Sequence, residues 1–287
     1  MFRVGLAQMT PILGDVAANL ALHRQWIERA REQKIDLLMF PELSLTGYHL
    51  RDLVPDVALK ADSPALKELS QAAGEMSLVV GFVEESPSFR FHVSAAYLEA
   101  GHVIHTHRKV YLPTYGMFDE ERYLDAGGRL RAFESRFGPS VMLICEDLWH
   151  PSLAYLAAHE GVFFLLCIAD SPARGLSGAS VDAAQVYERL CRVYAQFFQV
   201  WVIFVNRVGF EEGVNFWGGS MVVNPMGEVI ARAPLMDEHL LVAEVDEGEI
   251  RRARIFAPLL ASERLDLTLR ELKRIVESPG SASDERT

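Results

Sequence analysis

Three side chains with acid–base or nucleophilic chemistry follow directly after apolar segments of the chain. Glu42 comes after 37–41, Lys109 after 103–108 and Cys145 after 141–144. Short apolar segments bounded by turn residues are typical of buried strands. Because ligands of open α/β sheets bind outside the carboxyl ends of the strands, we expect Glu42, Lys109 and Cys145 to meet in one crevice.

Each of the three residues also has an ordinary structural explanation. A free cysteine is usually a small core residue, and a glutamate or lysine at a strand end is usually a solvated charge. Together they predict more, because a carboxylate can take the proton of a thiol and an ammonium can stabilise the anion that forms. Cys145 is also followed by Glu146 and Asp147, so its surroundings are polar. The set predicts a thiolate nucleophile with an oxyanion partner.

The segments between these residues predict the layers that position them. The expected strands lie at 4–9, 36–40, 78–83, 92–99, 102–109, 141–144, 162–168, 201–205, 220–224, 227–232 and 240–245. An amphipathic helix is expected at 19–31, and further helices are expected at 64–76, 152–159 and 183–198. Strands that are apolar throughout are covered on both faces, so this alternation predicts a layered α/β fold. No repeat or linker divides the chain, and we expect one domain at 1–277 and a disordered tail at 278–287.

The composition excludes several classes of protein. Half of the 287 residues are hydrophobic and 23% are charged, which excludes a fibrous or largely disordered chain. The net charge of −11 argues against a nucleic-acid partner. The three cysteines form no CxxC pair or disulfide framework, and no secretory signal pattern or membrane-length apolar run is present. We therefore expect a reduced cytoplasmic protein that contacts neither nucleic acid nor membrane.

Three motifs resemble those of the nitrilase, or carbon–nitrogen hydrolase, superfamily. They read MFPELSLTGY at 39–48, HRKVYLPTYGMFDEERY at 107–123 and LICEDLWHP at 143–151, and the resemblance extends from Phe2 to about Arg254. Each motif is specific, and their order and spacing match the family. The resemblance implies a four-layer αββα sandwich that usually dimerises through its outer helices, so we expect a homo-oligomer.

The resemblance also implies catalytic roles for the residues of the three motifs. Cys145 would be the nucleophile and Glu42 the general base. Lys109 would stabilise the tetrahedral oxyanion, assisted by the backbone N–H of Glu146. Amide hydrolysis by these groups passes through a thioester and needs no metal or organic cofactor.

A second glutamate often follows the lysine in this family. Glu120 matches that position and would orient the lysine and the substrate, although the neighbouring Glu121 is the alternative. Asp147 and Trp149 match residues that shape the loop behind the nucleophile, and we expect both to be structural.

The residues of the motifs are most similar to those of the glutamine-hydrolysing domain of glutamine-dependent NAD synthetases. In that branch Glu146 would contact the α-amino group of the substrate, while Tyr115 matches a pocket aromatic and Ser171 a substrate-binding serine. Two features differ from the branch. No SGGxDS-type loop of the synthetase half occurs in this sequence, and the usual cations after the Ser-Pro step are missing, with Arg174 as a possible replacement.

The sequence therefore favours a thiol-dependent hydrolase of a small amide. A glutaminase subunit that delivers ammonia to a separate synthetase is the alternative, and a nitrile hydrolase uses the same residues. A non-catalytic module is disfavoured because Glu42, Lys109 and Cys145 are all present.

Several other residues have simpler interpretations. Cys167 and Cys191 are expected in the core. His105 and His107 lie two residues apart but have no third ligand at a matching spacing, so no metal site is predicted. The segment 255–260 and the helix 183–198 are candidate dimer surfaces.

Overall fold

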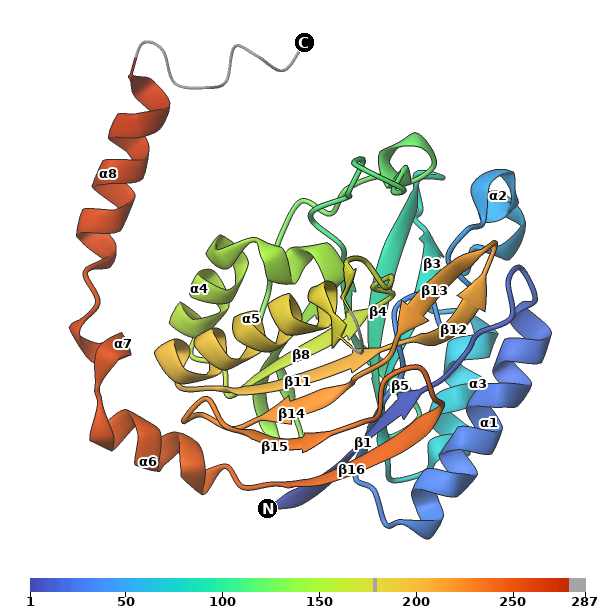
Figure 1. Cartoon of the computed structure of the whole chain (residues 1–287), viewed down its shortest axis with the longest axis horizontal. Helices are drawn as coiled ribbons and strands as arrows, with labels where there is room; N and C mark the ends of the chain where they lie inside the picture. Colours follow the sequence, from blue (N-terminus) through green and yellow to red (C-terminus); the bar gives the residue numbers. More distant parts are fainter. Residues whose placement is uncertain (178–179, 279–287) are drawn as a thin grey trace.

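Two six-stranded sheets form the middle of the molecule (Figure 1). The computed structural model describes residues 1–177 and 180–278. The first sheet contains, in spatial order, β16 (His239–Val245), β1 (Phe2–Gln8), β2 (Leu37–Met39), β3 (Ser77–Glu85), β4 (Phe91–Glu99) and β5 (His102–Arg108). The second contains β15 (Val229–Arg232), β14 (Met221–Val223), β11 (Trp201–Asn206), β8 (Phe164–Ala169), β7 (Gly138–Ile144) and β6 (Phe133–Ser135). In each sheet the three central strands are parallel, β1–β2–β3 and β7–β8–β11.

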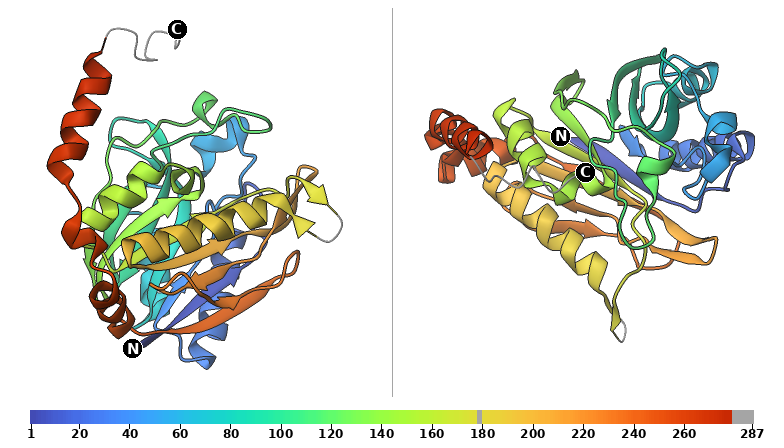
Figure 2. Two further views of the ribbon diagram at one scale, coloured as in Figure 1. Left: turned by 60° about the vertical axis from the view of Figure 1, so that its left-hand side comes forward. Right: turned by 90° about the horizontal axis from the view of Figure 1, so that it is seen from above.

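Helices cover the outer face of each sheet, as the two views of Figure 2 show. α1 (Val16–Glu32) and α3 (Pro64–Ala73) pack on the first sheet, and α4 (Pro151–His159) and α5 (Asp182–Phe198) pack on the second. Asp15 caps α1 by accepting a hydrogen bond from the Ala18 backbone N–H, and Ser63 and Pro64 begin α3. The predicted four-layer αββα sandwich is confirmed.

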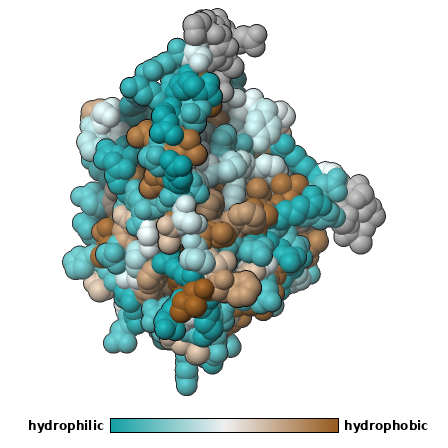
Figure 3. Space-filling view, turned by 90° about the vertical axis from the view of Figure 1, so that its left-hand side faces the viewer, coloured by the Kyte–Doolittle hydropathy of each residue, from teal (hydrophilic) through white to brown (hydrophobic). Residues whose placement is uncertain are grey.

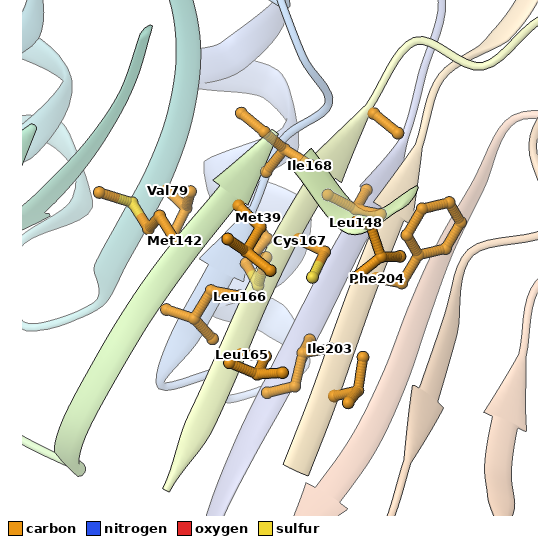
Figure 4. Close-up of a cluster of buried hydrophobic side chains, with 14 of the residues drawn as sticks. Met39, Val79, Met142, Leu148, Leu165, Leu166, Cys167, Ile168, Ile203 and Phe204 are labelled. Carbon is orange, nitrogen blue, oxygen red and sulfur yellow. The ribbon is translucent and has the colours of Figure 1, made fainter. Parts of the chain in front are cut away.

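The strand side chains divide between two cores. Leu37 and Met39 of β2 lie between the two sheets, whereas Leu38 faces α1 and α3. This alternation is the two-residue period of a strand. Figure 4 shows part of the larger buried cluster, in which Met39 and Val79 of the first sheet lie near residues of the second. Cys167 is buried on β8 and Cys191 is buried on α5, as predicted.

The strand and helix predictions are correct in kind, with shifted ends. The helix predicted at 64–76 ends at Ala73, because Gly74 takes a positive φ of 66° that closes the helix. The hairpin predicted at 220–232 is present as β14 and β15. Several short elements were not predicted: α2 (Val54–Val57), the small ladders β9 (Leu176–Ser177) with β10 (Ser180–Val181) and β12 (Val208–Glu211) with β13 (Val214–Trp217), and the single 3-10 turns Arg51–Leu53, Glu120–Arg122 and Cys145–Trp149.

The C-terminal helices form an arm that leaves the sandwich (Figures 1 and 2). It consists of α6 (Gly248–Phe256), α7 (Leu259–Ser262) and α8 (Leu265–Glu277). No residue of α7 or α8 is buried. The tail predicted at 278–287 lies outside the described residues except for Ser278. Among the helices that the structure describes, none is long and apolar enough to cross a membrane.

Candidate active site

Glu42 is fully buried just beyond the end of β2. One carboxylate oxygen, Oε2, accepts the backbone N–H of Asp170 at 2.9 Å, and the other accepts Lys109 Nζ at 2.8 Å. The loop that carries Glu42 crosses very close to Gly81 of β3. A Cβ at position 81 would lie 2.5–2.9 Å from backbone atoms of residues 41–43, so the glycine is needed for this close approach.

Lys109 follows β5 and its side chain is fully buried between two carboxylates. Its Nζ donates to Glu42 Oε1 and to Glu120 Oε1, at 2.8 Å in each case. Burial opposes the charge, but the carboxylates of Glu120 and Glu42 outweigh it and raise the lysine pKa well above its ordinary value. Lys109 is therefore an ammonium that is held in place from two sides.

Glu120, rather than Glu121, is the second acidic partner of the lysine. Glu120 is buried, and its Oε1 also accepts the hydroxyl of Tyr48 at 2.6 Å, whereas Glu121 is exposed. Burial raises the pKa of Glu120 to about 7; the ammonium of Lys109 opposes this rise and the charge of Glu42 adds to it. Glu42, Lys109 and Glu120 thus form one buried network.

Cys145 stands at a sharp turn where β7 ends and a short 3-10 turn begins. Its φ is +46°, a conformation that costs a non-glycine residue on the order of 1–3 kcal/mol. Burial and the negative charge of Glu42 raise the pKa of the thiol well above its ordinary value, although Lys109 and Tyr187 oppose the rise. The resting sulfur is thus a protonated thiol that needs a base.

Asp147 holds this turn against the chain that follows Lys109. Its Oδ1 accepts the backbone N–H groups of Val110 and Tyr111 at 2.9 and 3.1 Å, and its Oδ2 accepts that of Ile144 at 3.1 Å. His107 donates to the same Oδ2 at 2.9 Å. Four hydrogen bonds therefore converge on one buried carboxylate, which fixes the cysteine turn relative to the lysine.

His107 and His105 do not share a site. His105 stacks on the ring of Phe133, 4.7 Å between centroids, while His107 is paired with Asp147. Within residues 1–177 and 180–278, no group of three potential metal ligands is found.

A cavity of about 350 Å³ opens over the sulfur of Cys145. The four residues predicted to contact substrate all line it: Tyr115, Glu146, Ser171 and Arg174. The Tyr115 hydroxyl donates to the carboxylate of Glu146 at 2.9–3.0 Å, and Ser171 Oγ accepts the indole N–H of Trp217 at 3.0 Å. Glu42 and Lys109 are fully buried and do not line this cavity.

Arg174 places a cation in the same cavity as the carboxylate of Glu146. Its guanidinium lies 4.3 Å from the ring centroid of Phe118 and 5.4 Å from that of Tyr115. Its Nη2 is buried and has no hydrogen-bond partner among the residues described. The cavity therefore carries two acidic residues, Glu146 and Asp182, and one basic residue, Arg174.

Several residues of the site were not predicted from the sequence. Trp149, expected to be purely structural, also lines the cavity, as do Asp182 and Tyr187 of α5. Asp170, which donates its backbone N–H to Glu42, was not predicted either. The only available signal was position, because Asp170 directly follows β8 and Asp182 begins α5.

Comparisons with known proteins identify relatives of most of the chain. The carbon–nitrogen hydrolase family model matches residues 3–255. The glutamine-dependent NAD(+) synthetase of Thermotoga maritima is 31% identical over 261 residues, which cover 89% of this chain and 44% of that protein. The chain spans about half the length of the curated relatives it matches.

Among the solved structures with the same fold, some chains are about twice as long as the matched region and others have about the same length. The glutamine-dependent NAD+ synthetase of Acinetobacter baumannii superposes with a TM-score of 0.75 at 30% identity, over 87% of this chain and 46% of that one. A carbon–nitrogen hydrolase from Helicobacter pylori G27 superposes with a TM-score of 0.82 at 23% identity, over 95% of this chain and 99% of that one. The second likeness shows the fold alone.

Proposed function

Because the chain belongs to the carbon–nitrogen hydrolase family, we propose that it cleaves the C–N bond of a small amide, giving an acid and ammonia or an amine. The reaction proceeds through a thioester on Cys145. One observation carries the proposal: the Cys145 thiol lines a cavity and is close enough to the hydrogen-bonded Glu42, Lys109 and Glu120 for their charges to shift its pKa.

The reaction begins with proton transfer from the Cys145 thiol to Glu42. This step is required because burial keeps the thiol protonated at rest. The thiolate attacks the amide carbonyl carbon, and the oxyanion that forms is stabilised by the Lys109 ammonium and the backbone N–H of Glu146. Glu42 returns its proton to the leaving nitrogen, and the C–N bond breaks to leave the thioester.

Hydrolysis of the thioester completes the cycle. Glu42 takes a proton from water, the resulting nucleophile attacks the thioester carbonyl, and the acid leaves as the Cys145 thiol is restored. Positioned proton transfer contributes roughly 10²–10⁴-fold, and the loss of an oxyanion donor costs roughly 10²–10³-fold. Glu120 holds Lys109 in position throughout the cycle.

The charges of the cavity favour an ω-amide of an α-amino acid, with glutamine as the first candidate. Glu146 would accept the α-ammonium group, and Arg174, whose Nη2 has no partner within the described part of the chain, would bind the α-carboxylate. The relatives named as glutamine-dependent NAD synthetases support this choice. Tyr115 and Ser171 would complete the walls around the substrate.

A second candidate is a glutaminase subunit that delivers ammonia to a separate synthetase. The observation that favours it is the kind of relative, since the chain matches over 89% and 88% of its length proteins named as glutamine-dependent NAD(+) synthetases. Under this proposal glutamine hydrolysis by the isolated chain is slow, and a synthetase partner accelerates it.

Ammonia release by the purified protein tests both candidates. The substrates are glutamine, asparagine, short ω-amides, N-carbamoyl amino acids and a nitrile, each with the Cys145→Ala variant as control. Turnover of one amide by the wild type, absent in the variant, supports the hydrolase. Equal ammonia release by both proteins contradicts the Cys145 mechanism, and turnover of the nitrile alone would contradict the amide assignment.

We also propose that the protein forms a homo-oligomer through its outer helices and C-terminal arm. Phe197 of α5 and Ile255 and Phe256 of α6 are 58–79% exposed. The arm continues this surface with exposed leucines on α8, including Leu269 and Leu272. Figure 3 shows apolar residues gathered on this side of the molecule. A monomer at micromolar concentration in sedimentation would contradict the proposal.

A further inference from the structure

Tyr187 contacts the sulfur of the proposed nucleophile from a helix that none of the three sequence motifs includes. It lies in the second turn of α5, and its hydroxyl oxygen is 3.2 Å from Cys145 Sγ. The side chain is 2% exposed and lines the same cavity as Cys145. No other hydrogen bond to this sulfur is found among the described residues.

Aromatic neighbours hold the Tyr187 ring in one orientation. The ring centroids of Phe204 and Trp217 lie 4.9 and 5.9 Å from that of Tyr187, and Trp149 meets the ring edge-on at 5.5 Å. A ring that is packed in this way keeps its hydroxyl near the sulfur at little further entropic cost. The contact therefore belongs to a rigid part of the cavity wall.

We propose that Tyr187 is a further catalytic residue, which donates its hydroxyl hydrogen bond to Cys145 Sγ and stabilises the thiolate that attacks the substrate. This inference rests on the proposed function of Cys145 as the nucleophile. It assigns to this chain a thiolate-stabilising group in addition to Lys109.

The direction of the hydrogen bond follows from the acidities of the two groups. Burial and the nearby Cys145 charge raise the pKa of Tyr187 well above its ordinary value, so the phenol keeps its proton. A phenol O–H is a good donor and a thiolate is an acceptor, whereas a thiol is only a weak one. The bond is therefore stronger after Glu42 has taken the thiol proton than before, and it lowers the cost of forming the thiolate.

The hydrogen bond weakens again when the sulfur forms the thioester. When the thiolate attacks the carbonyl carbon, its electron pair forms the S–C bond and the negative charge moves to the carbonyl oxygen. The sulfur of the thioester is neutral and accepts hydrogen bonds poorly. Tyr187 keeps its own proton throughout, so Glu42 remains the group that exchanges protons.

The test is the pH dependence of Cys145 alkylation by iodoacetamide in Tyr187→Phe, which removes one oxygen and keeps the ring. Hydrogen bonds to charged groups correspond to roughly a 10- to 100-fold change in an equilibrium. We expect the apparent thiol pKa to rise by about one to two units and alkylation near neutral pH to slow roughly 10- to 100-fold. kcat/KM should fall by a similar factor, with the loss in kcat rather than KM.

Tyr97→Phe is the matched control, because it removes another buried tyrosine hydroxyl, one bonded to Glu99 on β4. It should leave the alkylation profile unchanged. The thiolate ultraviolet absorbance, corrected with Cys145→Ala, gives a second titration that is independent of turnover. If the Tyr187→Phe profile matches the wild type while thermal stability falls in both variants, Tyr187 is a packing residue and the proposal is wrong. A wild type that hydrolyses no amide would instead refute the proposed function, whatever the alkylation profile shows.

Discussion

Glu211 provides a direct test of how buried charges hold the loop that carries Glu42. It ends β12, and its carboxylate accepts the backbone N–H groups of Tyr48 and His49 at 3.0 and 2.7 Å. It also accepts Arg207 Nη1 at 3.0 Å. Tyr48 in turn donates to Glu120, so the anchor extends to the lysine network.

The magnitude of this anchoring follows from the acidity of Glu211. Burial opposes the charge, but the hydrogen bond from His49 and the charge of Arg207 outweigh it and lower the carboxyl pKa from 4.5 to about 2. A difference of about 2.5 units at 1.36 kcal/mol per unit corresponds to about 3 kcal/mol of stability. Because the folded pKa is the lower one, this stability is complete above the unfolded pKa near 4.5. It is lost as the pH falls from about 4.5 towards about 2.

We therefore expect Glu211→Gln to lower the free energy of unfolding by about 3 kcal/mol at pH 7. The difference from the wild type should shrink to about half at pH 3. Urea unfolding at the two pH values measures both numbers, with Glu212→Gln as a control because Glu212 is exposed. An equal loss at pH 7 and pH 3 would refute the reasoning, since the effect would then arise from packing and not from the charge.

Three further predictions concern the site itself. Iodoacetamide should modify only Cys145 in the native protein and no thiol in Cys145→Ala, because Cys167 and Cys191 are 0–1% exposed. Mass spectrometry counts the modified thiols, and a second modified thiol in the native protein would contradict the prediction. Asp147→Ala should lower the free energy of unfolding by about 3 kcal/mol or more, because it leaves four hydrogen-bond donors without their acceptor. A free energy of unfolding within about 1 kcal/mol of the wild type, measured by calorimetry, would exclude this anchoring role. Burial raises the pKa of Glu120 in the folded state to about 7, so the protonated carboxyl stabilises the fold at low pH, and this stability is lost as the pH rises from 4.5 to about 7. Glu120→Gln should remove this pH dependence of the free energy of unfolding, measured by urea titration. An unchanged pH dependence in the variant would contradict the prediction.

The local pattern of the chain was sufficient to predict the main elements and the strand-end residues. Periods of two and 3.6 residues are properties of short segments, so the central strands and the helices α1, α3, α4 and α5 were expected in place. The short β12–β13 ladder and the arm α6–α8 were not expected. The strands β12 and β13 pair as a local hairpin, but each has only four residues, which is too short for a clear alternation of apolar and polar residues. The exposure of α8 depends on where the other layers pack, which its own sequence does not specify.

By itself, the sequence determined which residues stand at the strand ends, because Glu42, Lys109 and Cys145 each follow directly after an apolar segment. The tertiary structure decided what these residues contact. Glu42 meets the backbone of Asp170, 128 positions away, and Cys145 meets Tyr187, 42 positions away. These contacts arise where the crossovers between parallel strands bring distant turns to one edge of the two sheets. A strand's own sequence specifies its faces and its end, but the register and packing of the other layers specify its neighbours, and those neighbours set the charge and acidity of the site.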